Sequence, residues 1–229
     1  MLKTENLCFS YGDQVILRDL TMELEAGECL VLTGPNGSGK STFLSLLAGI
    51  NKPGSGTVTR EGKLALVPQG TALFEDMSVE DNFRFFAELE GVSLSAQLPF
   101  SLEECRKMPV GKLSGGQKKR VSIGCALLGA PANLLLDEPC AGLDLSYQAE
   151  FAALMQALKS HGCSLVYAAH DPAEYIDFAD HVLFLGEEKS EIHPMSHFFS
   201  RQLDREEAIR IISDHYMALC QNFKEKHHE

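Results

Sequence analysis

Short apolar runs recur along the chain, and segments of helical character separate them. The runs have the length of strands and are rich in Leu and Val; they cover residues 29–33, 64–67, 134–136, 164–169 and 182–185. The segments between them that predict helices are 40–48, 115–128, 146–160 and 172–178. Because strands without polar alternation are buried on both faces, the pattern predicts an α/β fold with a mostly parallel sheet between layers of helices.

Two parts of the chain depart from this alternation. Residues 3–9 and 15–25 alternate polar and apolar side chains around a turn at Tyr11-Gly12-Asp13, which predicts an N-terminal antiparallel β-lobe. Residues 70–113 carry many Phe and Leu side chains but no strand pattern. We therefore expect a small helical lobe inserted into the sheet domain.

The end of the chain has the pattern of one amphipathic helix. Residues 204–207 have the form of a capping box, and apolar residues follow at near-helical spacing: Ala208, Ile211, Ile212, Tyr216, Leu219 and Phe223. The apolar face either packs on its own domain or binds a partner, and the first explanation is favoured. We expect a domain of residues 1–185 with a helical extension, residues 186–229, packed on it.

Composition narrows the classes of partner. The 229-residue chain has a formal net charge of −12, which repels the phosphates of nucleic acid over most of the surface. One local cluster, Lys118-Lys119-Arg120, is basic, and a solvated helix face explains it more simply than a nucleic-acid site.

No apolar run approaches the roughly 20 residues that span a bilayer, and the N-terminus lacks a secretory pattern. We expect a cytoplasmic protein whose seven cysteines, without a C-x-x-C pair, are reduced and mostly buried.

A glycine-rich segment carries the strongest chemical signal. Residues 34–41 have the form G-x-x-x-x-G-K-S, directly after a strand and at the start of a helix, a context that a merely flexible glycine loop does not require. The glycines let successive backbone N–H groups point at an anion, and the helix N-terminus adds partial positive charge. Lys40 then reaches the β and γ phosphates of ATP, and the Ser41 hydroxyl binds Mg²⁺. The residues expected to hold Mg-ATP are Gly34, Asn36, Gly37, Ser38, Gly39, Lys40, Ser41 and Thr42.

A second apolar strand ends in two carboxylates, Asp137 and Glu138. Alone this signal is weak, because strands often end in acidic residues. Downstream of a phosphate-binding loop, the pair is typical of a nucleotide hydrolase, with Asp137 on Mg²⁺ and Glu138 orienting the attacking water. The sequence therefore predicts ATP hydrolysis.

Residues 113–117, Leu-Ser-Gly-Gly-Gln, lie between these two motifs and enter a helix whose first turn offers unpaired N–H groups. In isolation the pentapeptide is also explained as a serine N-cap followed by glycines in a turn. In this position it resembles the signature of the ATP-binding cassette (ABC) family, and the resemblance covers residues 1–185. It implies that the opposite subunit's ATP is contacted through its γ-phosphate by Ser114, Gly115, Gly116 and Gln117.

Further positions match the family in order. Tyr11 resembles the aromatic residue that stacks on adenine, and Gln69 resembles the glutamine that links the Mg²⁺ site to the helical lobe. Asp144 ends a segment, Ala-Gly-Leu-Asp, that resembles the loop at the dimer interface, and His170 resembles the histidine that senses the γ-phosphate. The resemblance implies Glu138, His170 and Gln69 as catalytic residues and Ser41, Gln69 and Asp137 as Mg²⁺ ligands.

Two departures from the family pattern affect the expected structure. Only twelve residues separate Gly56 from Gln69, which predicts a trimmed hairpin before the glutamine. Cys140 stands where Thr or Ser is commoner, which predicts a change in packing without loss of activity.

The resemblance implies that two chains, expected to be identical, close head to tail around two ATP molecules and drive a separate transmembrane permease from the cytoplasmic face. The permease would bind near Gln69 and residues 74–82; Phe83, Phe85 and Phe86 line that groove or, as the favoured explanation, form the core of the lobe.

Residues 118–123 resemble exporter-type subunits more than importer-type ones. An ATPase that drives a soluble assembly complex remains the alternative. The 43 residues between Gln69 and Leu113 leave no room for the coiled coil of DNA-repair relatives.

Overall fold

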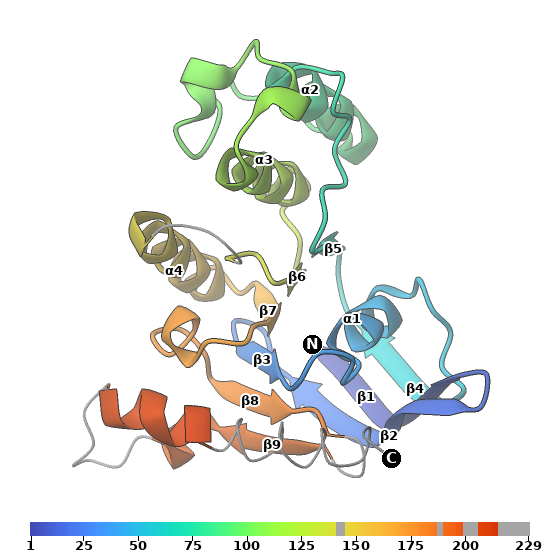
Figure 1. Ribbon diagram of the computed structural model, residues 1–229. Coiled ribbons are helices and arrows are strands. Elements are labelled where there is room, and N and C mark those ends of the chain that lie inside the picture. Colours follow the sequence, from blue (N-terminus) through green and yellow to red (C-terminus); the bar gives the residue numbers. More distant parts are fainter. Residues whose placement is uncertain (141–144, 187–189, 199–205, 215–229) are drawn as a thin grey trace.

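The structure is a computed structural model that describes residues 1–140, 145–186, 190–198 and 206–214. Its centre is a six-stranded sheet in the order β5-β6-β7-β3-β8-β9, parallel except for the last pair, β8 and β9 (Figure 1). The predicted α/β fold with a mostly parallel sheet is confirmed. The strands are β3 (Cys29–Thr33), β5 (Leu64–Val67), β6 (Asn133–Asp137), β7 (Ser164–Ala168), β8 (His181–Phe184) and β9 (Glu191–Pro194).

Every residue of β3, β6 and β7 is buried, because helices cover both faces of the sheet. Helix α1 (Lys40–Ala48) contributes Phe43 to one hydrophobic cluster, which contains Leu135. Helix α4 (Leu145–Ser160) contributes Phe151 to a second cluster, which contains Leu134 and Leu136. Alternate residues of β6 thus enter opposite clusters, as the two-residue period of a strand requires.

A three-stranded antiparallel sheet forms the predicted N-terminal β-lobe, in the order β2-β1-β4. Its strands are β1 (Leu2–Tyr11), β2 (Gln14–Leu24) and β4 (Ser55–Arg60), and Leu2, Leu7 and Leu17 enter the same cluster as α1. The sequence did not predict β4. It pairs with β1 rather than with β5, so the two strands in the short stretch before Gln69 belong to different sheets and form no hairpin together.

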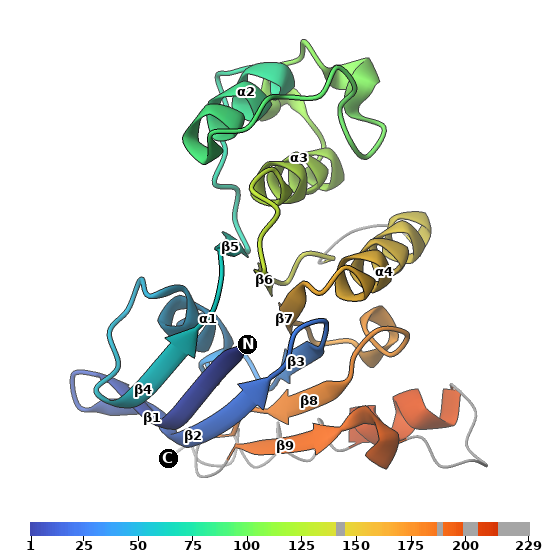
Figure 2. The same ribbon diagram turned by 180° about the vertical axis from the view of Figure 1, so that it is seen from behind.

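The helical lobe projects from the sheet domain as a separate body (Figures 1 and 2). It contains α2 (Val79–Glu90), two 3-10 helices (Leu102–Cys105 and Val110–Lys112) and α3 (Gly115–Leu127). Val121 and Cys125 of α3 pack with Val79 and Phe83 of α2 in one cluster, so the core of the lobe extends beyond the predicted boundary at residue 113.

The end of the described chain differs in three ways from the predicted elements. The helix predicted at 172–178 is a 3-10 helix, Pro172–Glu174, followed by turns, because Tyr175 leaves helical geometry and enters the core. Strand β9 was not predicted. Residues 206–214 form a helix whose Ala208 and Ile212 join the cluster around Phe151, so this helix packs on its own domain. The other residues of the predicted terminal pattern, 204–205 and Tyr216, Leu219 and Phe223, lie outside the described residues.

The described part of the chain contains six of the seven cysteines, all free and all but Cys8 buried, as the sequence predicts. No helix in these ranges combines the length and the hydropathy that a membrane crossing requires.

Truncation of the lobe core should destabilise the protein. Phe83 is fully buried, and the space of a Cβ on Gly124 of α3 is already taken by Cζ of Phe83, 2.6 Å away. We expect Phe83→Ala to lower the free energy of unfolding by about 3–5 kcal/mol, because it leaves a cavity between α2 and α3. Urea denaturation measures this. Phe85→Ala in the same helix is the control, since Phe85 is 36% exposed, and an equal loss in both variants would contradict the packing described.

Candidate functional site

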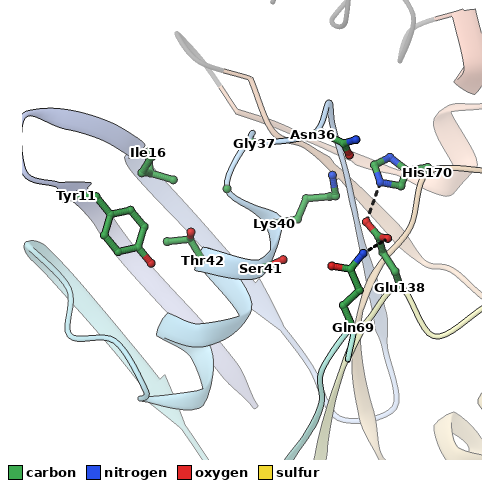
Figure 3. A pocket seen from close by; sticks show the side chains of 11 residues that line it. Tyr11, Ile16, Asn36, Gly37, Lys40, Ser41, Thr42, Gln69, Glu138 and His170 are labelled. Carbon is green, nitrogen blue, oxygen red and sulfur yellow. Dashed lines mark hydrogen bonds and ion pairs between the residues drawn. The ribbon is translucent and has the colours of Figure 1, made fainter. Parts of the chain in front are cut away.

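Four parallel strands that are neighbours in the sheet, β5, β6, β7 and β3, deliver polar residues to one edge. Gln69 follows the end of β5, Glu138 follows β6, His170 follows β7, and the glycine-rich loop follows β3. Since parallel strands end on the same side, residues far apart in sequence meet there. These side chains surround one pocket (Figure 3).

The glycine-rich loop has backbone geometry that other residues rarely adopt. Gly34, Gly37 and Gly39 have φ angles of 155°, 84° and 99°. A Cβ at Gly34 would lie 2.6 Å from the carbonyl oxygen of Leu185, and one at Gly39 would lie 2.7 Å from Cγ2 of Ile16. Gly39 is the N-cap of α1, so the free N–H groups of that helix open into the loop. The loop therefore has the form of an anion-binding site.

Lys40 is only 6% exposed, and its Nζ donates to the carbonyl oxygens of Gly34 at 2.8 Å and of Pro35 at 3.3 Å. The ammonium is thus held inside the curve of the loop (Figure 3). The buried hydroxyl oxygens of Thr33 and Ser38 have no hydrogen-bond partner within the described residues. A buried cation and unsatisfied hydroxyl groups beside a nest of N–H groups suit a bound phosphate chain.

Glu138 joins the ends of three strands. Gln69 Nε2 donates to Glu138 Oε2 at 2.9 Å, and His170 Nε2 lies 2.8 Å from Glu138 Oε1 (Figure 3). Glu138 has a φ angle of 47°, an uncommon conformation for a residue other than glycine. The backbone turn and the two hydrogen bonds hold the carboxylate at the pocket, opposite the loop.

Asp137 is buried beneath this carboxylate and is hydrogen-bonded to Ser41 of α1. Burial raises the pKa of Asp137, while the bond to Ser41 and the positive charges of Lys40 and Lys119 oppose that rise. Ser41 and Asp137, two of the predicted Mg²⁺ ligands, are therefore adjacent, and both offer the oxygen atoms that Mg²⁺ prefers. The third, Gln69, borders the same pocket.

The pocket has a volume of about 610 Å³. At the end away from Glu138 lies Tyr11, whose ring is 54% exposed and makes an edge-to-face contact with Phe9 at 4.8 Å. Asn51 Nδ2 donates to the Tyr11 hydroxyl at 3.1 Å. The predicted residues that line the pocket are Tyr11, Asn36, Gly37, Gly39, Lys40, Ser41, Thr42, Gln69, Glu138 and His170.

Sequence reasoning missed Ile16, which also lines the pocket. Its side chain reaches the loop only because β2 crosses beside Gly39, and nothing in the local sequence indicates that contact. Gly34 and Ser38 belong to the loop without lining the pocket.

The signature residues lie apart from this pocket. Ser114 caps α3, accepting a hydrogen bond from the backbone N–H of Gln117 at 3.2 Å, while Gln117 Oε1 accepts one from the N–H of Ser114 at 3.0 Å. None of Ser114, Gly115, Gly116 and Gln117 lines the pocket, and Ser114 and Gly115 are exposed. Asp144 lies outside the described residues.

The prediction of a solvated basic face on α3 is wrong for Lys119. This side chain is 8% exposed, because α3 packs it against the end of β5. Its Nζ donates to the carbonyl oxygens of Pro68 at 3.0 Å and Gln69 at 3.1 Å.

Cys140 is buried beside Tyr167, and its side chain interacts with the phenol group. Burial raises the pKa of the Cys140 thiol to about 12, so the side chain is a neutral thiol in the core. The expected change in packing relative to Thr or Ser stays a prediction.

A glycine-rich loop between a strand and a helix, with an acidic pair at the end of a nearby parallel strand, defines a P-loop nucleotide hydrolase. A family model described as "ABC transporter" matches residues 17–141. The chain belongs to the ABC transporter family, as an ATP-binding ATPase subunit.

Curated relatives include subunits of both export and import systems. A lantibiotic transport ATP-binding protein, SrtF of Streptococcus pyogenes, is 34% identical over 202 residues, which are 82% of this chain and 88% of the relative. A cytochrome c biogenesis ATP-binding export protein, CcmA of Gluconobacter oxydans, is 33% identical over 80% of this chain and 87% of its own length. A spermidine/putrescine import ATP-binding protein, PotA of Chromobacterium violaceum, is 32% identical over 83% of this chain but only 58% of its own length.

Solved structures agree on the fold. The ATP-binding subunit of an ABC transporter matches with a TM-score of 0.80 and 26% identity, covering 86% of this chain and 91% of the other. A dimeric ATP-binding cassette in a post-hydrolysis state, bound to ADP and Pi, matches with a TM-score of 0.73 and 24% identity over 83% of this chain and 98% of the other.

Loss of the lysine in the loop should weaken nucleotide binding. We expect Lys40→Ala to raise the dissociation constant for ATP roughly 10- to 100-fold, because a charge-assisted hydrogen bond to phosphate is lost. Titration with a fluorescent ATP analogue measures this. Lys63→Ala is the control, since Lys63 is exposed and pairs with Glu90 at 2.9 Å, far from the loop in sequence. Unchanged affinity in Lys40→Ala would rule out a role for Lys40 in binding phosphate.

Proposed function

We propose that this chain is the ATP-hydrolysing subunit of a membrane transporter and that it drives a separate transmembrane permease. The observation that carries the catalytic part is the position of Glu138, held between Gln69 and His170 and facing the loop that contains Lys40 (Figure 3). The transport part is supported by the printed roles of the relatives, which are ATP-binding subunits of transport systems.

The chemistry follows from residues of this chain. The N–H groups of the loop and the Lys40 ammonium bind the β and γ phosphates, while the exposed ring of Tyr11 stacks on adenine. Glu138 orients the attacking water and accepts its proton, and His170 holds the carboxylate and contacts the γ-phosphate. Ser41, Asp137 and Gln69 are the proposed ligands of Mg²⁺, which would neutralise charge on the phosphates when bound.

The signature segment explains why we propose a pair of identical chains. Ser114 and Gly115 are exposed at the N-terminus of α3, and they do not line the pocket of their own chain. An exposed helix N-terminus binds anions well, so the segment suits the γ-phosphate of an ATP held by a second chain. The dimeric cassette bound to ADP and Pi is similar in fold.

The helical lobe offers an apolar surface for the permease. Phe83 is lobe core, as favoured from the sequence, but Phe74 and Phe85 are 45% and 36% exposed and stack edge to face at 4.8 Å. Exposed aromatic side chains of this kind are typical of interfaces. Binding here would place the chain on the cytoplasmic face of the membrane.

We propose export as the direction of transport, supported by the resemblance of residues 118–123 to exporter-type subunits and by the printed role of CcmA.

Removal of the catalytic carboxylate should separate binding from turnover. We expect Glu138→Gln to bind ATP normally yet hydrolyse it at least a hundredfold more slowly, because the amide cannot accept a proton from water. Such a variant should also accumulate as an ATP-bound dimer, visible by size-exclusion chromatography. A phosphate-release assay gives the rate, with Glu28→Gln as the control, since Glu28 does not line the pocket. Turnover near that of the unmodified chain would refute the assignment of Glu138.

Purification with partners tests the transport part. We expect the tagged chain, isolated from its native cells in mild detergent, to retain a polytopic membrane protein identifiable by mass spectrometry. Phe85→Asp should release it, since a charge would enter the proposed apolar contact, while Glu61→Asp should not. Recovery of soluble partners alone would favour the alternative, an ATPase that drives a soluble assembly complex.

A further inference from the structure

Lys119 differs from the basic residues on either side of it. Lys118 pairs with Glu75 at 2.8 Å, and Arg120 lies over the ring of Tyr147, 4.9 Å from its centroid. Lys119 alone of the three is buried, at 8% exposure, with its ammonium between α3 and the end of β5. It lines no part of the pocket, so the proposed chemistry assigns it no role.

The contacts of Lys119 lead directly to the catalytic carboxylate. Its Nζ donates to the carbonyl oxygens of Pro68 and Gln69 at 3.0 and 3.1 Å. The side chain of the same Gln69 donates to Glu138 at 2.9 Å, and Glu138 in turn contacts His170 at 2.8 Å. Lys119 therefore fixes the main chain of the residue whose side chain holds Glu138.

The other end of this connection is the signature segment. Ser114 and Lys119 belong to one continuous helix, α3, in which Ser114 is the N-cap. Five residues of α-helix span about 7.5 Å, so a shift of the first turn is carried to Lys119 with little loss. One rigid element thus joins the surface proposed to contact the partner's ATP to the main chain of Gln69.

A buried ammonium is costly, and this cost argues for a specific use of its charge. Taking an ammonium out of water is unfavourable unless hydrogen bonds and opposite charges compensate. Here two carbonyl groups accept hydrogen bonds, and the carboxylates of Asp137 and Glu138 attract the ammonium. Methionine, a side chain of similar length, would fill the space without that cost but could not hold the two carbonyl groups.

We propose that Lys119 is a positioning residue that couples the signature segment to Gln69 and Glu138 of the same chain. In a closed pair, contact of Ser114 to Gln117 with the partner's ATP sets the position of α3, and Lys119 passes that position to the chain's own catalytic carboxylate. Each ATP site is then sensitive to occupation of the other. This inference rests on the proposed hydrolytic pair.

The test is a double-mutant cycle on the full chain, with kcat, KM and ATP affinity measured for each variant. We expect Lys119→Met to lower kcat by about tenfold or more, the loss typical when the support of a catalytic group is removed, and to leave ATP affinity unchanged. In a Gln69→Ala background the same substitution should cause no further loss, because Lys119 acts through Gln69. Lys118→Met, one position away on the same helix, should behave as the unmodified chain.

Several results would overturn the coupling role. A normal kcat in Lys119→Met would overturn it. So would a further loss of kcat when Lys119→Met is added to Gln69→Ala, or a loss of ATP affinity in Lys119→Met as large as its loss of kcat. If Lys119→Met fails to fold, Lys119→Gln replaces it, since its NH2 group keeps hydrogen-bond donors but loses the positive charge. This variant should retain part of the activity, and full activity would contradict the proposal. Failure of the proposed function is a separate outcome, because then the unmodified chain and Lys118→Met would also lack ATPase activity.

Discussion

The parallel alignment of β5, β6, β7 and β3 is the constraint on which the site depends. Because these neighbours all end at one edge, Gln69, Glu138, His170 and the glycine-rich loop meet although the chain separates them widely. The hydrophobic clusters on the two faces of the sheet fix the register of the strands, and through it the positions of the polar groups. Burial of the strands and assembly of the site thus have the same physical cause.

In the proposed pair, one chain is an incomplete unit. Its pocket collects the loop, the carboxylates and the histidine, but the signature residues lie on the helical lobe and outside that pocket. The lobe has a hydrophobic cluster of its own, which joins α2 to α3, while Ile123 of α3 belongs to the cluster on the sheet. Lys119 of the lobe donates hydrogen bonds to the carbonyl oxygens of Pro68 and Gln69, next to the pocket.

The core strands could be predicted because a strand buried on both faces leaves an unbroken apolar run; the bounds of β3, β5 and α1 agree with the structure. Strands β4 and β9 could not, since polar edge strands such as Ser55–Arg60 lack that signal. The loop, Glu138, Gln69 and His170 were located from motifs, and the structure brings them to one pocket, with Asp137 hydrogen-bonded to Ser41. The contacts of Ile16, Asn51 and Lys119 depend on how distant elements pack, which local sequence does not record.

The lobe leaves the sheet domain after β5 and returns at β6, two strands that are adjacent in the sheet. Because the two strands run parallel, the end of β5 and the start of β6 lie at opposite ends of this strand pair, and α3 is nearer to them than α2 (Figures 1 and 2). The line through these two attachments is an axis about which the lobe can rotate against the sheet. A rotation about this line displaces α2 farther than Lys119, whose ammonium is hydrogen-bonded to Pro68 and Gln69 next to the first attachment, so a small shift at the catalytic end corresponds to a larger one at the outer end.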